Sequence, residues 1–151
     1  VAGASDVGAA FLYDGLTLAL ISTLTGSASG DQVGGGGVVP LPNGNLIVTC
    51  GDGHKVIEFD AQGKSVWELN ENDLPGNTLR LMAGCQRLPN GNTVFCVYLG
   101  HGHIGEQPQV IEVTPDKKVV WDVADHAQFK TINQIQLLDI PGDVVRGDIH
   151  R

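Results

Sequence analysis

The feature that most constrains the fold is a five-residue block, Leu-Pro-Asn-Gly-Asn, which stands at residues 41–45 and again 47 residues later at 88–92. Each copy leads into an apolar run, then into a Val-Ile-Glu segment at 56–58 or 110–112, and then into a Val-Trp pair. A repeat of this length is typical of one supersecondary unit made of several strands. We therefore expect a chain built from copies of a single structural unit.

Four strands are predicted within each unit. Asn-Gly and Gln-Gly-Lys sequences between β-branched runs are hairpin signals, so consecutive strands are expected to pair as antiparallel neighbours. The predicted strands are residues 37–41, 46–50, 55–59 and 65–69 in the first full unit, and residues 84–88, 93–99, 109–113 and 119–123 in the second.

The two ends of the chain hold complementary partial units. Residues 11–14 and 20–24 align with the third and fourth strands, while residues 136–140 and 144–146, around a Pro-Gly-Asp turn, align with the first and second. Half a unit, two whole units and the other half make three units of four strands. We assign a single domain over 1–151, with a split unit (9–24 with 135–150) and full units at about 36–69 and 84–123.

Four-stranded units of this length, repeated around an axis, are β-propeller blades. The predicted fold is all-β, with three blade equivalents of four antiparallel strands, and the split ends match the way that propellers usually close. Propellers have about 4 to 8 blades, so three cannot close a ring alone. Either two chains form a six-bladed ring, or the chain is part of a longer propeller. A β-prism or sandwich with three-fold repeats is the remaining alternative.

Residues 59–67, Phe-Asp-Ala-Gln-Gly-Lys-Ser-Val-Trp, resemble the end of the repeat in bacterial quinoprotein-like (PQQ-like) propellers, which has the pattern Asp-x-x-Gly-Lys-x-x-Trp. The second copy, at 114–121, departs from this pattern with Lys117 in place of the glycine. The Leu-Pro-Asn-Gly-Asn block is similar to repeats of NHL-like and quinoprotein-like propellers from uncharacterised bacterial proteins, and residues 30–34 resemble repeats of large bacterial surface proteins. The resemblance implies a fold rather than an activity. No quinone or other cofactor is predicted, because a three-unit chain lacks most of such an enzyme's ring.

Charge and hydropathy exclude two classes of partner. The net charge is −8, and the nine Lys and Arg residues form no basic stripe, which argues against nucleic acid. The most apolar stretch, residues 16–24, is too short to span a bilayer, so no membrane insertion is predicted. The chain opens on Val1, so we expect a processed chain or a piece of a longer one. The compartment stays open, with a secreted or periplasmic location expected ahead of the cytoplasm.

The three cysteines are predicted to be free and buried. Cys50 and Cys96 fall at nearly equivalent places in successive units. Packed sheets stand about 10 Å apart, whereas a disulfide needs Cα atoms within about 7 Å. Cys85 takes the place that Val38 holds one unit earlier, which favours an apolar environment.

Strand alternation places the long connections on one face, which we call the loop-rich face. These connections are residues 25–36, 51–54, 70–82, 100–108 and 124–133. A polar rim around a central opening is where a ligand is expected to bind. The predicted binding residues are Asp52, His54, Asn72, Asp73, Arg80, His101, His103, Glu106, Asp125 and His126, and His150 is expected to approach the same rim.

The sharpest local pattern on this face is Gly-His-Gly-His at residues 100–103, followed by Glu106. His101 and His103, with a nearby carboxylate, are weak candidates for a Zn²⁺ site. The alternative is an exposed loop with solvated imidazoles, and no metal is predicted. If the chain is an enzyme, His54, His101, His103 and Glu106 are the expected catalytic residues, because imidazole titrates near neutral pH and serves as a general base.

Two further features have structural interpretations. Trp67 and Trp121 occupy equivalent places in the repeat and are predicted to wedge between units. The glycine run at residues 34–37 lacks the Lys-Ser/Thr of a phosphate-binding loop. We interpret it as a flexible approach to an inner strand, where small residues relieve crowding.

The sequence favours a non-enzymatic binding and assembly module. Unpaired strand edges of the split unit are satisfied by pairing between chains, so a homodimer or larger ring is expected. The loop-rich face would take a small molecule, a glycan or a partner protein. One alternative is a lactone or ester hydrolase, or a lyase, acting in the central mouth. The other is a carbohydrate-binding surface protein that uses rim residues such as Asn72 or Asp73.

Overall fold

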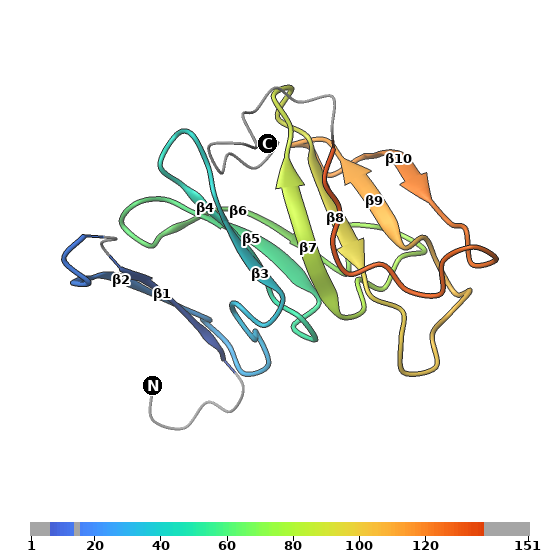
Figure 1. Ribbon diagram of the computed structural model, residues 1–151, viewed down its shortest axis with the longest axis horizontal. Coiled ribbons are helices and arrows are strands. Elements are labelled where there is room, and N and C mark those ends of the chain that lie inside the picture. Colours follow the sequence, from blue (N-terminus) through green and yellow to red (C-terminus); the bar gives the residue numbers. More distant parts are fainter. Residues whose placement is uncertain (1–6, 14–15, 138–151) are drawn as a thin grey trace.

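The computed structural model describes residues 7–13 and 16–137, in which ten β-strands and no helix are found (Figure 1). The N-terminal hairpin consists of β1 (Ala9–Tyr13) and β2 (Leu20–Thr25). The central sheet consists of β3 (Gly37–Pro40), β4 (Leu46–Thr49), β5 (Lys55–Phe59) and β6 (Ser65–Asn70). The terminal sheet consists of β7 (Met82–Arg87), β8 (Thr93–Val97), β9 (Val110–Val113) and β10 (Val119–Val123).

The prediction of an all-β fold with four-stranded antiparallel sheets is confirmed. Every pair of neighbouring strands runs antiparallel, and each full sheet keeps the order of the sequence. Figure 1 shows the three sheets following one another across the molecule, an arrangement consistent with propeller-like blades. Of the strands predicted near the C-terminus, residues 138–146 lie outside the described part, and residues 136–137 form no strand.

A one-residue bulge recurs in the last hairpin of each sheet. The extra residue is Ile21 in β2, Val66 in β6 and Val120 in β10, and all three side chains are exposed. Bulges at matching positions fix the correspondence between the units independently of the sequence alignment. The N-terminal hairpin therefore corresponds to the third and fourth strands of the other two sheets, as the sequence predicts.

The sheets are held together by apolar faces that pack against one another. Between the central and terminal sheets the core contains fully buried residues from both, including Ile47, Leu69, Phe95 and Ile111. A second core joins the N-terminal hairpin to the opposite face of the central sheet. Its members include Ala10, Leu24, Val48 and Phe59. The central sheet thus buries both of its faces against its neighbours, as in other repeat architectures.

The inner strands of neighbouring sheets approach each other closely. The backbone N–H of Met82, at the start of β7, donates to the carbonyl of Gly51 at 2.9 Å. A Cβ on Gly36 would stand 2.1 Å from the carbonyl oxygen of Met82 and 2.4 Å from Oγ1 of Thr49. The predicted need for small residues in this glycine run is confirmed at Gly36.

Residues 132–137 pack on part of the outer face of the terminal sheet, beside β7. Ile132, Ile135 and Leu137 pack against its buried apolar residues. The segment is anchored beside β7, because Gly84 donates its N–H to the carbonyl of Asn133 at 2.8 Å. It therefore occupies the place where a following unit would put its first strand.

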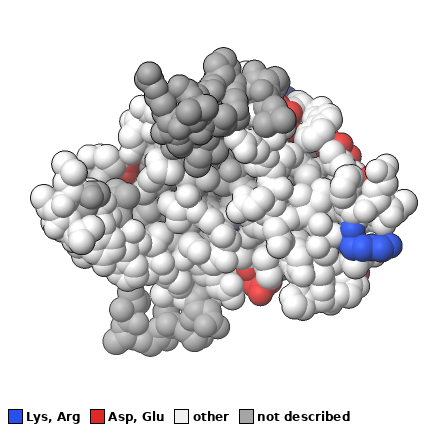
Figure 2. Space-filling view, viewed as in Figure 1, with Lys and Arg blue, Asp and Glu red and all other residues white. Residues whose placement is uncertain are grey.

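The described residues also bear on the cysteines and on the surface. Cys50, Cys85 and Cys96 are free and buried, as predicted, and burial raises the pKa of each thiol to about 12. On the face drawn in Figure 2, charged side chains of the described residues are sparse. Within residues 7–13 and 16–137 there is no helix with the length and apolar character needed to cross a membrane.

Candidate functional site

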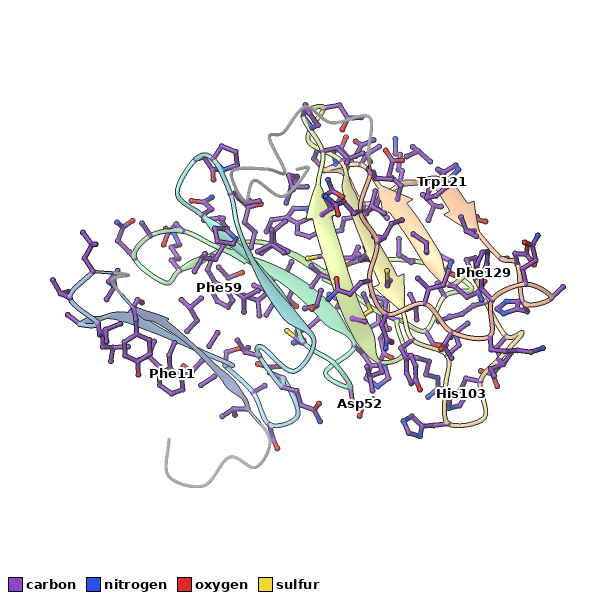
Figure 3. The ribbon with its side chains drawn as sticks, viewed as in Figure 1. Phe11, Asp52, Phe59, His103, Trp121 and Phe129 are labelled. Atoms are coloured by element: carbon purple, nitrogen blue, oxygen red, sulfur yellow. The ribbon has the colours of Figure 1, made fainter. Side chains whose placement is uncertain are left out.

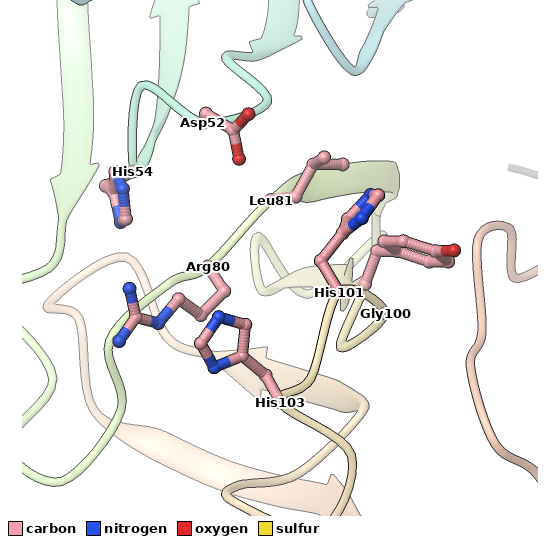
Figure 4. Close-up of a pocket in the computed structure, with 8 residues that line it drawn as sticks. Asp52, His54, Arg80, Leu81, Gly100, His101 and His103 are labelled. Carbon is pink, nitrogen blue, oxygen red and sulfur yellow. The ribbon is translucent and has the colours of Figure 1, made fainter.

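A pocket of about 230 Å³ opens where three connections of the central and terminal sheets meet (Figure 4). The β4–β5 loop, the β6–β7 connection and the β8–β9 connection each contribute to its wall. Strand alternation brings these connections to one face, which is the reason that residues distant in sequence meet here. The pocket is lined by Asp52, His54, Arg80, Leu81, Tyr98, Gly100, His101 and His103.

Half of the predicted binding residues come together in this pocket. They are Asp52, His54, Arg80, His101 and His103. Figure 4 shows the guanidinium of Arg80 on the side of His54 and His103, with Asp52 across the pocket from it.

His54 is held in one orientation by the β6–β7 connection. Its Nδ1 lies 3.1 Å from the carbonyl oxygen of Thr78 and 3.5 Å from Oε2 of Glu71. A carbonyl oxygen only accepts, so Nδ1 carries the proton and donates. Nε2 is then left for a ligand, as an acceptor when the ring is neutral.

His103 is oriented in the same way by a carboxylate. Its Nδ1 lies 2.9 Å from Oε2 of Glu106, three residues later in the same loop. Glu106 therefore acts behind His103 and is absent from the pocket wall. The contact again places the proton on Nδ1 and leaves Nε2 for a ligand.

Two pocket histidines have strained backbone. His54 has φ +55° and His101 has φ +59°, in the left-handed region that non-glycine residues rarely adopt. Such conformations cost of order 1–3 kcal/mol each and cluster at functional sites. The ring of His101 stands edge-on to that of Tyr98, with centroids 5.8 Å apart.

Arg80 is the most distinctive member of the pocket. Within the described residues its guanidinium has no hydrogen bond or ion pair, and its Nε is buried without a partner. A buried, unpaired donor is costly, and the cost is greater for a charged group. The pocket therefore contains a positive charge that no side chain of residues 7–13 or 16–137 pairs with.

Two other predicted binding residues, Asn72 and Asp73, belong to a turn after β6. Asn72 donates its N–H to Oδ1 of Asn70 at 3.1 Å. Oδ2 of Asp73 accepts a hydrogen bond from Nζ of Lys117 at 2.8 Å. Lys117 is the residue that replaces the glycine of the first copy of the repeat. Burial raises the pKa of Asp73, but the hydrogen bonds from Lys117 and from the N–H of Asn70 outweigh it and lower the pKa overall. No contact places either residue at the pocket, so no observation favours their role in carbohydrate binding.

The last two predicted residues close a neighbouring loop. Oδ1 of Asp125 accepts from the N–H of Gln128 at 3.0 Å, and Nε2 of His126 lies 3.1 Å from the carbonyl oxygen of Gln107. Both are half-buried, and neither is among the residues that line the pocket. His150 lies outside the described residues.

The weak metal candidates His101 and His103 share the pocket. In the described ranges, no three His, Cys, Asp or Glu side chains gather in a way that could hold a metal ion.

Sequence reasoning missed Tyr98, Leu81 and Gly100, which supply the less polar wall. Tyr98 was expected inside a strand at 93–99, but β8 ends at Val97 and frees Tyr98 for the pocket. A Cβ on Gly100 would lie 2.3 Å from Cε1 of Tyr98, so a side chain at residue 100 would displace the Tyr98 ring. The available signal was a tyrosine two residues before the Gly-His-Gly-His block at 100–103.

Trp67 lies between the sheets, while Trp121 is partly exposed. Nε1 of Trp67 donates to the carbonyl of Pro115 at 2.9 Å, and the guanidinium of Arg87 lies 5.3 Å from the Trp67 ring centroid. Trp121 has the corresponding place in the terminal sheet, where 43 % of its surface is exposed. The wedge role predicted for both is therefore seen at Trp67.

Comparison with known proteins shows a fold and no family. No protein-family model matches the sequence, and no curated protein matches it significantly. Among the matching solved structures is a protein of unknown function from Bacteroides caccae, with 24 % sequence identity and a TM-score of 0.69. The match covers 86 % of this chain and 47 % of that one, so the chain spans about half the length of its structural neighbour.

Proposed function

We propose that this chain is a non-enzymatic binding and assembly module of the quinoprotein-like or NHL-like propeller kind. It joins a second copy of itself to complete a six-bladed ring and offers the pocket on its loop-rich face to a small ligand. The observation that carries the proposal is an aromatic face of the N-terminal hairpin that has no covering sheet among the described residues.

Phe11 and Tyr13 form this aromatic face, with 59 % and 55 % of their surfaces exposed. The shared bulge identifies their counterparts in the other two sheets, which are all at most 5 % exposed. Burying each aromatic side chain would contribute about 1.5–3 kcal/mol. The counterparts are Ile57 and Phe59 in the central sheet and Ile111 and Val113 in the terminal sheet.

The terminal sheet presents the complementary face at the opposite end of the molecule (Figure 3). In the central sheet, Glu58 accepts a hydrogen bond from Arg87 of the next sheet at 2.6 Å, beside Trp67. The terminal sheet repeats these positions as Glu112 and Trp121. Within the described residues Glu112 keeps the bond from Asn92 at 2.7 Å but receives none from an arginine. The surface around Glu112 and Trp121 therefore has the residues with which the central sheet contacts the sheet that follows it.

The two open faces fit each other. The N-terminal hairpin carries the face that packs on a preceding sheet, and the terminal sheet carries the face that packs on a following one. When the hairpin of one copy docks on the β9–β10 face of a second copy, the reverse contact forms by symmetry and the assembly closes. A ring of two chains also fits the structural neighbour, since one chain spans 47 % of that protein.

Light scattering on the purified full chain tests the proposal. A mass near 32 kDa, twice the 15.9 kDa of one chain, is expected. Phe11→Asp and Trp121→Asp, on the two faces, should each give a folded monomer. Ile104→Asp is the control, because Ile104 is similarly exposed but lies on the β8–β9 loop. A folded wild-type monomer at all concentrations, or variants with unchanged mass, would overturn the assembly.

A lactone or ester hydrolase is the second candidate, favoured by the 2.9 Å contact between His103 and Glu106. A carboxylate that fixes the proton on Nδ1 leaves Nε2 able to act as a general base. The test is turnover of a lactone and ester panel before and after diethylpyrocarbonate treatment, alongside His103→Gln. Turnover that is absent, or indifferent to both changes, excludes the hydrolase.

A further inference from the structure

The geometry points to a small hydroxylated carboxylate, of the sugar-acid class, as the ligand of the pocket. Its carboxylate pairs with Arg80, and its hydroxyl groups bond to His54, His103 and Asp52. This inference rests on the proposed binding role of the loop-rich face and names the chemistry that the pocket recognises.

The positive end of the pocket selects an oxyanion. Arg80 is half-buried and its Nε is buried without a partner, while no carboxylate of the described residues pairs with its guanidinium. A guanidinium offers a rigid fork of donors that matches the two oxygens of a carboxylate. Lys117, by contrast, is already neutralised by Asp73, and Arg87 by Glu58.

The two oriented histidines select hydroxyl groups. Because the Thr78 carbonyl and the Glu106 carboxylate fix the protons on Nδ1, a neutral His54 or His103 presents Nε2 as an acceptor. When the carboxylate of the ligand pairs with Arg80, Nε2 of either histidine can accept a hydrogen bond from a ligand hydroxyl group close to that carboxylate. Figure 4 places both rings on the side of the pocket that holds the guanidinium.

Asp52 and the neighbouring acids exclude a second negative charge on the ligand. Asp52 lines the pocket, and Glu71 and Glu106 stand behind His54 and His103. These carboxylates repel a second negative charge, which disfavours a phosphate dianion or a dicarboxylate, whereas the side-chain oxygens of Asp52 accept hydrogen bonds from hydroxyl groups.

The size and the less polar wall of the pocket suit a short carbon chain or a single ring. A volume of about 230 Å³ lies below the range of about 300–1,000 Å³ that is typical of drug-sized sites. Tyr98 and Leu81 provide the surface on which the carbon skeleton rests.

Calorimetric titration of the full chain with three probes tests the inference. D-Gluconate carries both a carboxylate and hydroxyl groups, acetate carries the carboxylate alone, and D-glucose carries the hydroxyl groups alone. Gluconate is expected to bind most tightly. Arg80→Gln should weaken gluconate about 10- to 100-fold, the loss expected for a hydrogen-bonded charge. His103→Gln should reduce the preference for gluconate over acetate. Lys64→Gln, an exposed cation on the β5–β6 turn, is the control and should leave affinity unchanged.

Three results would overturn the inference: no binding of any probe, equal binding of glucose and gluconate, or unchanged gluconate affinity in Arg80→Gln. The mass of each variant, measured in parallel, separates this inference from the assembly. Gluconate bound by a monomer would contradict the ring and leave the ligand class standing. A stable dimer that binds no probe would contradict the ligand class and leave the ring standing.

Discussion

At the scale of the residue, Asp31 shows how one buried carboxylate fixes the connection between two sheets. It lies in the β2–β3 connection with only 4 % of its surface exposed. It accepts from the N–H groups of Ser27 at 2.7 Å and Ala28 at 2.8 Å, and from Nζ of Lys55 in β5 at 2.7 Å. Burial raises the pKa of Asp31, but these hydrogen bonds, led by that from Lys55, more than compensate and hold the pKa below its ordinary value.

Replacing Asp31 by Asn should destabilise the chain in a pH-dependent way. The change leaves the half-buried Lys55 without its closest anion, and we expect a loss of about 2–4 kcal/mol at pH 7. Because the folded pKa is lowered, the stabilisation is present above the ordinary value of 3.8 and fades as pH falls through the folded pKa. Urea unfolding at pH 7 and near pH 3 measures the difference.

The control is Asp116→Asn, an exposed carboxylate in the β9–β10 turn, which should change stability by less than about 0.5 kcal/mol. A deficit of Asp31→Asn that stayed the same at both pH values would contradict the assignment of the effect to ionised Asp31.

At the scale of the element, Gly36 limits how closely the inner strands approach. A Cβ there would meet the Met82 carbonyl of the next sheet at 2.1 Å, and backbone cannot yield as a flexible side chain can. Gly36→Ala should therefore cost about 2–3 kcal/mol of unfolding free energy, at the upper end of overpacking effects. Gly37→Ala is the matched control, because its Cβ would meet only Oγ1 of Thr49 at 3.5 Å. Equal unfolding midpoints for the two variants would show that the inner strands can move apart.

The sequence predicts the elements well because strands and their turns are local. The Pro-Asn-Gly-Asn turns are set by positive φ at Gly44 and Gly91, and the strands on either side of them formed as expected. The bulges at Ile21, Val66 and Val120 had no local signal, since each depends on register with the paired strand. Strand ends near the pocket were also misplaced, because long-range contacts release Tyr98 from β8.

Topology alone predicts which loops, and therefore which residues, share the face that carries the candidate site. Strand alternation places the loops on one face, which was enough to nominate Asp52, His54, Arg80, His101 and His103 together. It gives no information on which loop side chains are already engaged by neighbours. Asp73 is held by Lys117 from another hairpin turn, a contact that depends on how the sheets pack. That Arg80 has no partner among the described residues, the observation on which the ligand class depends, is likewise a property of the folded chain.

At the scale of the whole molecule, Arg87 joins the central and terminal sheets. It donates to Glu58 of β5 at 2.6 Å and to the carbonyl of Gly91 at 3.0 Å, with its guanidinium near the ring of Trp67. The side chains of Arg87 and Glu58 are 17 % and 10 % exposed, so water screens their attraction only in part. If the sheets behave as stacked units, their cooperativity depends on interface contacts of this kind.

Arg87→Ala should lower the free energy of unfolding by about 2–4 kcal/mol, because Glu58 is left buried without its cation. Glu112→Gln changes the corresponding carboxylate of the terminal sheet, which no described arginine contacts, and should cost less than about 0.5 kcal/mol. A double-mutant cycle of Arg87→Ala and Glu58→Gln, with the free energy of unfolding measured in urea, gives the interaction free energy of the two side chains. We expect a value of about 1–3 kcal/mol. Strictly additive losses would mean that the Arg87–Glu58 pair adds nothing to the joining of the two sheets, which would then rest on the apolar core and on the other contacts between them, such as that of Lys117 with Asp73.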